Sequence, residues 1–338
     1  MTLEERIEAF VKLGERINDM GEEEFEILSI RVQNNNTWFT PEQTKNALQA
    51  LSINLVKENL EAWLSSYDLK DAIKTKSIGI LMAGNVPAVG FHDFMCVLMA
   101  GHRACIKLSS SDHVLMNWLI TELITLEPKF EEMISVEDML KAKDAYIATG
   151  SDNSARYFEY YFGKYPHIIR KNRTSVGILD GFEQADDLRI FGKDIFQYYG
   201  LGCRNVSKLF VRDKDTLIEF LDAIAEFKEV AQNHKYHNNY EYNKSIYLVN
   251  KEQHLDNGFL LMRESSALVS PIAVLYYELY DDMEQLNTRL SEEKEKIQCI
   301  VSLQGWYPGS LEFGSAQCPG LSDYADGVDT LQFLKQLS

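Results

Sequence analysis

The chain has 338 residues, of which 45% are hydrophobic, and its 34 basic and 51 acidic side chains give a net charge of -17. This composition predicts a folded protein large enough for two domains, and the acidic surplus argues against a broad surface for nucleic acid or anionic lipid, because phosphates would be repelled. No apolar run is long enough for a membrane span, and the first residues do not resemble a signal peptide. Together with five cysteines that show no close pairing, this favours a reduced, cytoplasmic protein without disulfides or structural zinc.

Residues 1–76 are predicted to form a helical segment. Thr40-Pro41-Glu42-Gln43 is typical of a helix start, because threonine caps the first turn and proline fits its first position. Apolar residues then recur at helical spacing from Ala47 to Trp63. One face of this segment is therefore expected to pack against the domain that follows.

Strand and helix patterns alternate after residue 76, which predicts an α/β fold. Three strand–turn–helix units come first: strand 77–83 with the turn Gly84-Asn85-Val86-Pro87, strand 104–108 with helix 114–126, and strand 144–148 with helix 153–162. Further strands are expected at 167–170, 176–180, 207–211, 245–250, 272–278 and 298–303, and further helices at 187–199, 216–227 and 281–294. Residues 233–243 are interpreted as a polar loop, although His234 and His237 stand three positions apart.

Two places in these units suit an anionic ligand. Lys107 lies near the carboxyl end of its strand, where parallel sheets usually bind ligands. Gly150 and Ser151 form a turn before a helix, and the backbone N–H groups of such a turn suit a pyrophosphate. No GxGxxG motif is present, so a standard dinucleotide fingerprint is not indicated. Each feature alone also fits an α/β protein without a nucleotide site.

Cys203 is the main candidate for a nucleophile. It lies on a short connection between a predicted helix and a predicted strand, with Gly200 and Gly202 just before it. These glycines leave room for the close approach of another molecule. The alternative is a buried structural thiol, which is the commoner role of an isolated cysteine.

Four segments in sequence order, GILMAGNVP, ACIKLSS, IATGS and GLGCRNVSKLFV, together resemble the aldehyde dehydrogenase superfamily. Within it, the chain is most similar to the branch formed by the fatty acyl reductase of bacterial bioluminescence and its acyl-CoA reductase relatives, which share the segment Trp38-Phe39-Thr40 and the GNVP turn. The resemblance implies an α/β, aldehyde-dehydrogenase-like fold with a cofactor-binding and a catalytic domain. The implied division is a helical segment at 1–76, a nucleotide-binding domain at 77–175, a catalytic domain at 176–304, and a C-terminal segment at 305–338 that returns to the cofactor domain or an interface.

The resemblance also implies roles for individual residues. Cys203 would be the nucleophile, and the side-chain amide of Asn85 would stabilise an oxyanion beside the backbone N–H of Cys203. Lys107, with Ser109 or Ser110, would meet the adenosine ribose or its phosphate. The turn Thr149-Gly150-Ser151 would lie along the pyrophosphate.

Three departures from the superfamily pattern refine the expected chemistry. Arg170 stands where hydrolytic members carry a water-activating glutamate, which favours transfer of the acyl group to a thiol such as coenzyme A. Ser110 replaces an acidic residue that would bind a ribose hydroxyl, so NADPH is expected, with NADH as the alternative. The segment that usually holds the nicotinamide ribose is reduced to residues 267–271, with Glu264 as a substitute for its glutamate.

The expected function is NADPH-dependent reduction of an acyl-CoA to an aldehyde through a thioacyl group on Cys203. The acyl donor can alternatively be an acyl carrier or an acyl protein, which an acyl-protein synthetase partner would supply, and a homo-oligomer is a further expectation. Alternatives are reduction of an acyl phosphate, oxidation of an aldehyde, and a binding subunit that has lost catalysis.

Overall fold

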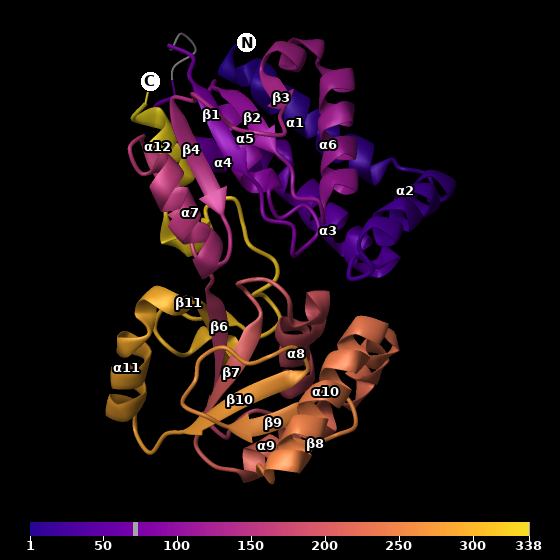
Figure 1. Ribbon diagram of the computed structural model, residues 1–338, viewed down its shortest axis with the longest axis vertical. Coiled ribbons are helices and arrows are strands. Elements are labelled where there is room, and N and C mark those ends of the chain that lie inside the picture. Colours follow the sequence, from indigo (N-terminus) through magenta and orange to yellow (C-terminus); the bar gives the residue numbers. More distant parts are fainter. Residues whose placement is uncertain (70–73, 338) are drawn as a thin grey trace. The chain divides into compact units, whose positions relative to one another are not determined.

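The computed structural model describes residues 1–69 and 74–337 (Figure 1). The chain forms two compact units, Met1–Asn172 with Gly320–Ser338, and Arg173–Pro319. The C-terminal return to the first unit therefore starts at Gly320, whereas the resemblance placed its beginning at residue 305. Within the described ranges, no helix is both long and apolar enough to cross a membrane.

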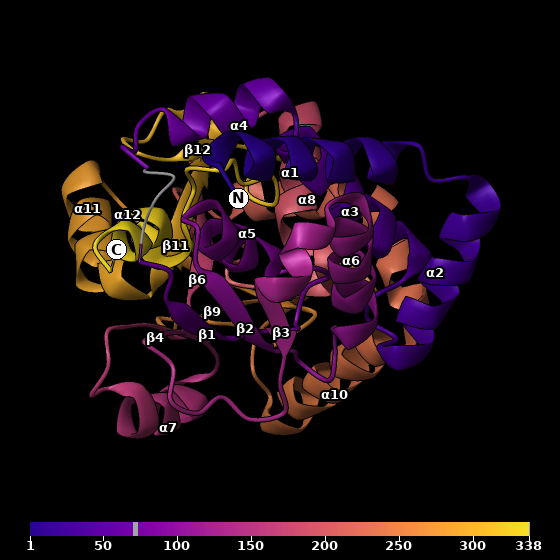
Figure 2. The same ribbon diagram turned by 90° about the horizontal axis from the view of Figure 1, so that it is seen from above.

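The N-terminal region is helical. Its helices are α1 (Leu3–Asn18), α2 (Glu22–Asn35), α3 (Pro41–Asn54) and α4 (Lys57–Leu64). The Thr40 side chain accepts a hydrogen bond from the Gln43 N–H at the start of α3, as predicted. Helix α1 packs against α3, α4, α5 and α6 (Figure 2). Residues 70–73 of the predicted segment lie outside the described residues.

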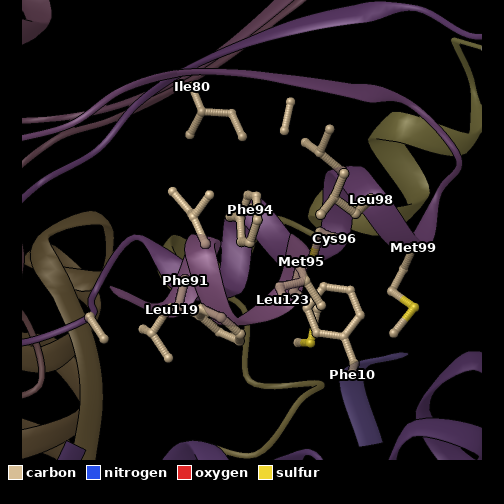
Figure 3. Close-up of a cluster of buried hydrophobic side chains, with 14 of the residues drawn as sticks. Phe10, Ile80, Phe91, Phe94, Met95, Cys96, Leu98, Met99, Leu119 and Leu123 are labelled. Carbon is tan, nitrogen blue, oxygen red and sulfur yellow. The ribbon is translucent and has the colours of Figure 1, made fainter. Parts of the chain in front are cut away.

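The sheet of the first unit has the order β3-β2-β1-β4-β5, and all of its strands are parallel. The strands are β1 (Ser77–Leu81), β2 (Arg103–Lys107), β3 (Ile134–Val136), β4 (Ala145–Thr149) and β5 (His167–Arg170). On one face, Ile80 and Ile106 pack with the helices α5 (Phe91–Met99) and α6 (His113–Leu126) and with Phe10 of α1 (Figure 3). On the other face, Tyr146 packs against Phe162 of α7 (Asp152–Phe162).

The C-terminal segment is bound to the first unit by buried polar contacts. Helix α12 (Thr330–Lys335) packs against α5. The Tyr324 hydroxyl accepts a hydrogen bond from the Trp63 indole at 2.8 Å and lies 2.7 Å from the Tyr67 hydroxyl, which donates to Asp329. These bonds join residues from the two ends of the chain into one core.

The second unit is built on a sheet with the order β12-β11-β6-β7-β10-β9-β8, parallel except for the β8–β9 pair. The strands are β6 (Thr174–Leu179), β7 (Val206–Val211), β8 (Leu255–Asp256), β9 (Leu261–Glu264), β10 (Val274–Leu279), β11 (Ile297–Ser302) and β12 (Leu311–Glu312). The helices are α8 (Ala185–Phe196), α9 (Asp215–Ala223), α10 (His234–Asn250) and α11 (Met283–Glu292). Every residue of β6 and β7 is buried, as expected for central strands covered on both faces.

Three predictions for the second unit were wrong. Residues 233–243 are not a loop and 245–250 are not a strand, because α10 runs through both as a helix of 17 residues. The Asn233 side chain caps this helix, and Tyr236, Tyr240 and Tyr247 are buried along one face. The predicted helix 187–199 also ends early, since α8 stops at Phe196.

Candidate active site

The connection before Cys203 is strained. Tyr198, Tyr199 and Gly200 take the left-handed conformation in succession, with φ of 55°, 59° and 78°. For a residue other than glycine this costs about 1–3 kcal/mol and persists only where the surroundings fix it; here both tyrosines are buried. The strained turn ends α8 and leads the chain into β7, with Cys203 partly exposed between them.

The first residues of β6 hold the segment that carries Cys203. The Asn205 carbonyl accepts hydrogen bonds from the Thr174 hydroxyl at 3.1 Å and the Ser175 N–H at 2.9 Å. The Ser175 hydroxyl donates to the Cys203 carbonyl at 3.1 Å. A second thiol, on Cys299 of β11, lies 2.9 Å from the same hydroxyl. Burial raises the pKa of the Cys299 thiol, so this second thiol keeps its proton at neutral pH.

Asn85 lies in the first unit, on the loop between β1 and α5, and its side chain is exposed. The loop is fixed from two sides. A Cβ at Gly84 would lie 2.3 Å from the Ser109 hydroxyl, so only glycine allows this approach. The Asp112 carboxylate accepts a hydrogen bond from the Ala88 N–H at 2.9 Å, where Ala88 has φ of 57°.

A cavity of about 520 Å³ adjoins the carboxyl ends of β1 and β2 in the first unit. Its lining consists of Leu81, Lys107, Met139, Leu140, Lys141, Ala142, Tyr146, Tyr157, Phe158, Tyr161, Phe162, Lys164 and Tyr165. The Tyr146 ring stacks on Phe162 with ring centroids 4.1 Å apart. A Cβ at Gly79 would lie 2.8 Å from the Tyr146 ring, so Gly79 allows this ring to lie over the strand. A lining that combines aromatic rings with lysines fits a flat base that carries phosphate.

The remaining predicted cofactor residues lie on two loops of the same unit. Ser151 caps α7, since its hydroxyl accepts a hydrogen bond from the Ser154 N–H at 3.3 Å. A Cβ at Gly150 would meet the Phe158 ring at 2.9 Å. Thr149 ends β4, and Ser110 is an exposed residue after β2. All six predicted cofactor residues thus belong to the first unit, as does Asn85, whereas Cys203 belongs to the second.

Arg170 has a structural partner that the sequence did not reveal. Its guanidinium is buried at the end of β5, 2.5 Å from the Asp93 carboxylate and 2.7 Å from the Thr330 hydroxyl. These contacts join β5, α5 and α12. Of the residues that the structure describes, no group of three or more His, Cys, Asp or Glu could hold a metal ion.

Comparisons with solved structures show the fold. One similar structure is aldehyde dehydrogenase 21 from Physcomitrella patens in complex with succinate. The aligned region covers 100% of this chain and 84% of that protein's chain, with a TM-score of 0.68 and 13% identity. Glyceraldehyde-3-phosphate dehydrogenase from Methanocaldococcus jannaschii, complexed with NADP, matches 90% and 76%, with a TM-score of 0.64 and 11% identity. An aldehyde dehydrogenase from Bacillus cereus in complex with NAD+ matches 89% and 72%, with a TM-score of 0.60 and 11% identity. The predicted aldehyde-dehydrogenase-like α/β fold is confirmed.

A search of curated protein sequences found no match. A family model described as acyl-CoA reductase (LuxC) matches residues 12–265, which is most of the chain and includes both Asn85 and Cys203. The match confirms the resemblance drawn from the four sequence segments and supports an enzyme of this type. The chain therefore belongs to the acyl-CoA reductase (LuxC) family.

Proposed function

We propose that this chain reduces an acyl-CoA to the aldehyde with NADPH, through a thioacyl group on Cys203. The observation that carries the proposal is the position of Cys203, partly exposed after a strained turn and bonded through its carbonyl to β6. Strained backbone of this kind clusters at functional sites, and here it lies just before Cys203. Membership of the acyl-CoA reductase family supports the reaction class.

The proposed reaction begins at the Cys203 sulfur. Its thiolate attacks the thioester carbonyl, a C–S bond forms to Cys203, and the bond to coenzyme A breaks as the coenzyme A thiolate leaves. The Asn85 amide and the Cys203 N–H are proposed to stabilise the oxyanion; loss of one such donor typically lowers the rate by about 10²–10³. When bound, the reduced nicotinamide supplies a hydride to the thioacyl carbon. The resulting thiohemiacetal loses the aldehyde and returns the thiolate to Cys203.

Lysines around the cavity support the preference for NADPH. Lys107, Lys141 and Lys164 line it, and its lining, as far as the chain is described, contains no Asp or Glu. Three cations without a carboxylate favour the additional 2'-phosphate of NADPH over the bare hydroxyl of NADH. We propose that Lys107 meets the ribose or its phosphate, and that Ser109, Ser110 and the turn at 149–151 lie along the remainder of the nucleotide.

The direct test follows three products at once. Purified protein is given acyl-CoA of graded chain length with NADPH or NADH, and NADPH oxidation, free coenzyme A thiol and aldehyde are measured in parallel. We expect equal amounts of all three, with one range of chain length preferred. Coenzyme A release without aldehyde, or no product with any acyl-CoA, would contradict reduction of an acyl-CoA. Activity that begins only when an acyl-protein donor is added would instead support a donor delivered by a partner.

Charge reversal tests the choice of cofactor. We expect Lys141→Glu and Lys164→Glu to raise the KM for NADPH by about tenfold or more, because each places a carboxylate at the cavity that would meet the 2'-phosphate. The KM for NADH should change much less. Lys294→Glu, an exposed reversal in the second unit, is the matched control. Equal effects on both nucleotides would contradict a 2'-phosphate site.

A further inference from the structure

The Ser175 hydroxyl is a fully buried junction of hydrogen bonds in the second unit. It donates to the Cys203 carbonyl at 3.1 Å, accepts from the Cys299 N–H at 3.3 Å, and lies 2.9 Å from the Cys299 sulfur. A serine hydroxyl has one hydrogen to donate and two lone pairs to accept. The hydroxyl hydrogen of Ser175 is donated to the Cys203 carbonyl, and one lone pair of its oxygen accepts from the Cys299 N–H. The second lone pair is used when the Cys299 S–H also donates to this oxygen. Burial keeps that thiol protonated, because it raises the Cys299 pKa.

Two shifts of strand register, each with extra residues on the neighbouring strand, lie at this junction. Between β6 and β7 the register shifts after Ser175, so that Val176 pairs with Lys208 and Ser207 is the extra residue. Between β6 and β11 the register shifts between Ile297 and Ile300, which places Cys299 within the shift. A bulge re-aims the groups around it and occurs often beside active sites. In the shift between β6 and β11, the Cys299 N–H donates to the Ser175 hydroxyl instead of to a backbone carbonyl of the neighbouring strand.

We propose that Ser175 is a positioning residue for the nucleophile, with Cys299 as the neighbour that orients the Ser175 hydroxyl. This inference rests on the proposed role of Cys203. The bond from Ser175 fixes the peptide plane that follows the Cys203 Cα, and thereby the direction in which the sulfur leaves the turn. The strained residues 198–200 fix the chain on the other side. Cys203 therefore lies between a strained turn, which the buried Tyr198 and Tyr199 fix, and a carbonyl that the Ser175 hydroxyl fixes.

The proposal predicts a loss of rate rather than of substrate binding. Misplacement of a reacting group by about 1 Å can cost roughly 10²-fold in rate. We expect Ser175→Ala to lower kcat and the single-turnover rate of Cys203 acylation by about 10- to 100-fold, with the KM values for acyl-CoA and NADPH within about threefold of the wild type. Cys299→Ser keeps an O–H donor and should retain most of the rate, whereas Cys299→Ala should lower it several-fold.

The double variant tests whether the two residues act together. Ser175→Ala/Cys299→Ala should be no slower than Ser175→Ala, because the thiol acts through the hydroxyl that is already gone. Ser302→Ala is the control: this serine is equally buried in β11, and its hydroxyl bonds Ser310 and the Tyr307 N–H. It should lower stability but leave the acylation rate unchanged. All rates are measured at a temperature at which circular dichroism shows each variant to be folded.

The measurement is the burst of coenzyme A released on mixing enzyme with acyl-CoA, with the acyl group located by peptide mass. Acylation of Ser175→Ala at the same rate as Ser302→Ala would overturn the positioning role. Additive losses in the double variant, or a slow Cys299→Ser, would overturn the part assigned to Cys299. Failure of the proposed function would look different, since wild-type protein would then show no acyl group on Cys203 at all.

Discussion

Replacing Asp112 by asparagine should change how the stability of the first unit depends on pH. Asp112 is buried at the N-cap of α6, but it makes no side-chain cap bond there. Instead one carboxylate oxygen accepts a hydrogen bond from the Ala88 N–H, and the other is buried without a hydrogen-bond partner among the described residues. Burial raises the pKa of Asp112 to about 8, although the bond from Ala88 opposes the shift.

The direction in which stability changes with pH follows from the number of protons that the folded and unfolded states bind. Between its unfolded pKa of about 4 and its folded pKa, Asp112 is ionised in the unfolded chain but protonated in the fold. The folded state therefore binds more protons, and stability is lost as the pH rises through this interval. From pH 5.5 to pH 8 the loss is at most about 3.4 kcal/mol, at about 1.36 kcal/mol per unit. The positive end of α6 favours the ionised form by about 0.3–1 kcal/mol, so we expect a loss of about 2 kcal/mol.

Asp112→Asn keeps an acceptor for the Ala88 N–H but cannot ionise. Any fixed cost of the amide is the same at both pH values and cancels when the two are compared. The assay is urea unfolding at pH 5.5 and 8, followed by tryptophan fluorescence, because Trp38, Trp63 and Trp118 all lie in the first unit. Relative to the variant, the wild type should lose about 2 kcal/mol over this interval. Stability profiles that run parallel at the two pH values would refute the reasoning.

Two further substitutions test buried charges. Arg170→Glu exchanges the ion pair with Asp93 for two facing carboxylates, so we expect a loss of about 3–5 kcal/mol in unfolding free energy, measured by urea unfolding; an unchanged midpoint would contradict the structural role. Lys208→Met removes a fully buried ammonium that donates to Glu278 and to the Ser265 carbonyl. Glu278 keeps its ion pair with Arg289 in this variant, so we expect a smaller loss of about 1–3 kcal/mol, from the Ser265 carbonyl left without its donor and the lost bond to Glu278. The measurement is again urea unfolding, and an unchanged midpoint would argue against a stabilising role of the ammonium.

Local sequence patterns predicted the units that carry the site. The strands expected at 77–83, 104–108 and 144–148 correspond to β1, β2 and β4, because apolar runs that end in glycine or serine turns are a strong local signal. The strand predicted at 245–250 was wrong. The β-branched and aromatic side chains of these residues favour a strand, but the cap at Asn233 and the buried tyrosines continue the helix α10 through them. The spacing of those tyrosines was present in the sequence as a helical signal.

The contacts around the candidate site could not be predicted from local sequence patterns, because they join residues far apart in the sequence. The bond between Ser175 and Cys299 joins residues 124 positions apart, at a shift of register between β6 and β11. Asp112 stands directly before helix α6, yet its carboxylate accepts a hydrogen bond from the Ala88 N–H, 24 positions away. Arg170 was interpreted through the resemblance alone, and its partner Asp93 lies on a helix that gives no sign of the pairing. Each of these contacts depends on how the folded chain brings distant residues together.

Trapping the acyl group tests the central claim most directly. Wild-type protein and Cys203→Ala are incubated with acyl-CoA in the absence of NADPH, released coenzyme A is counted, and the modified residue is located by peptide mass. We predict one coenzyme A released per chain and one acyl group on Cys203, with neither in the variant. An acyl group on Cys299 or Cys318 instead, or undiminished coenzyme A release by Cys203→Ala, would contradict the assignment of Cys203 as the nucleophile.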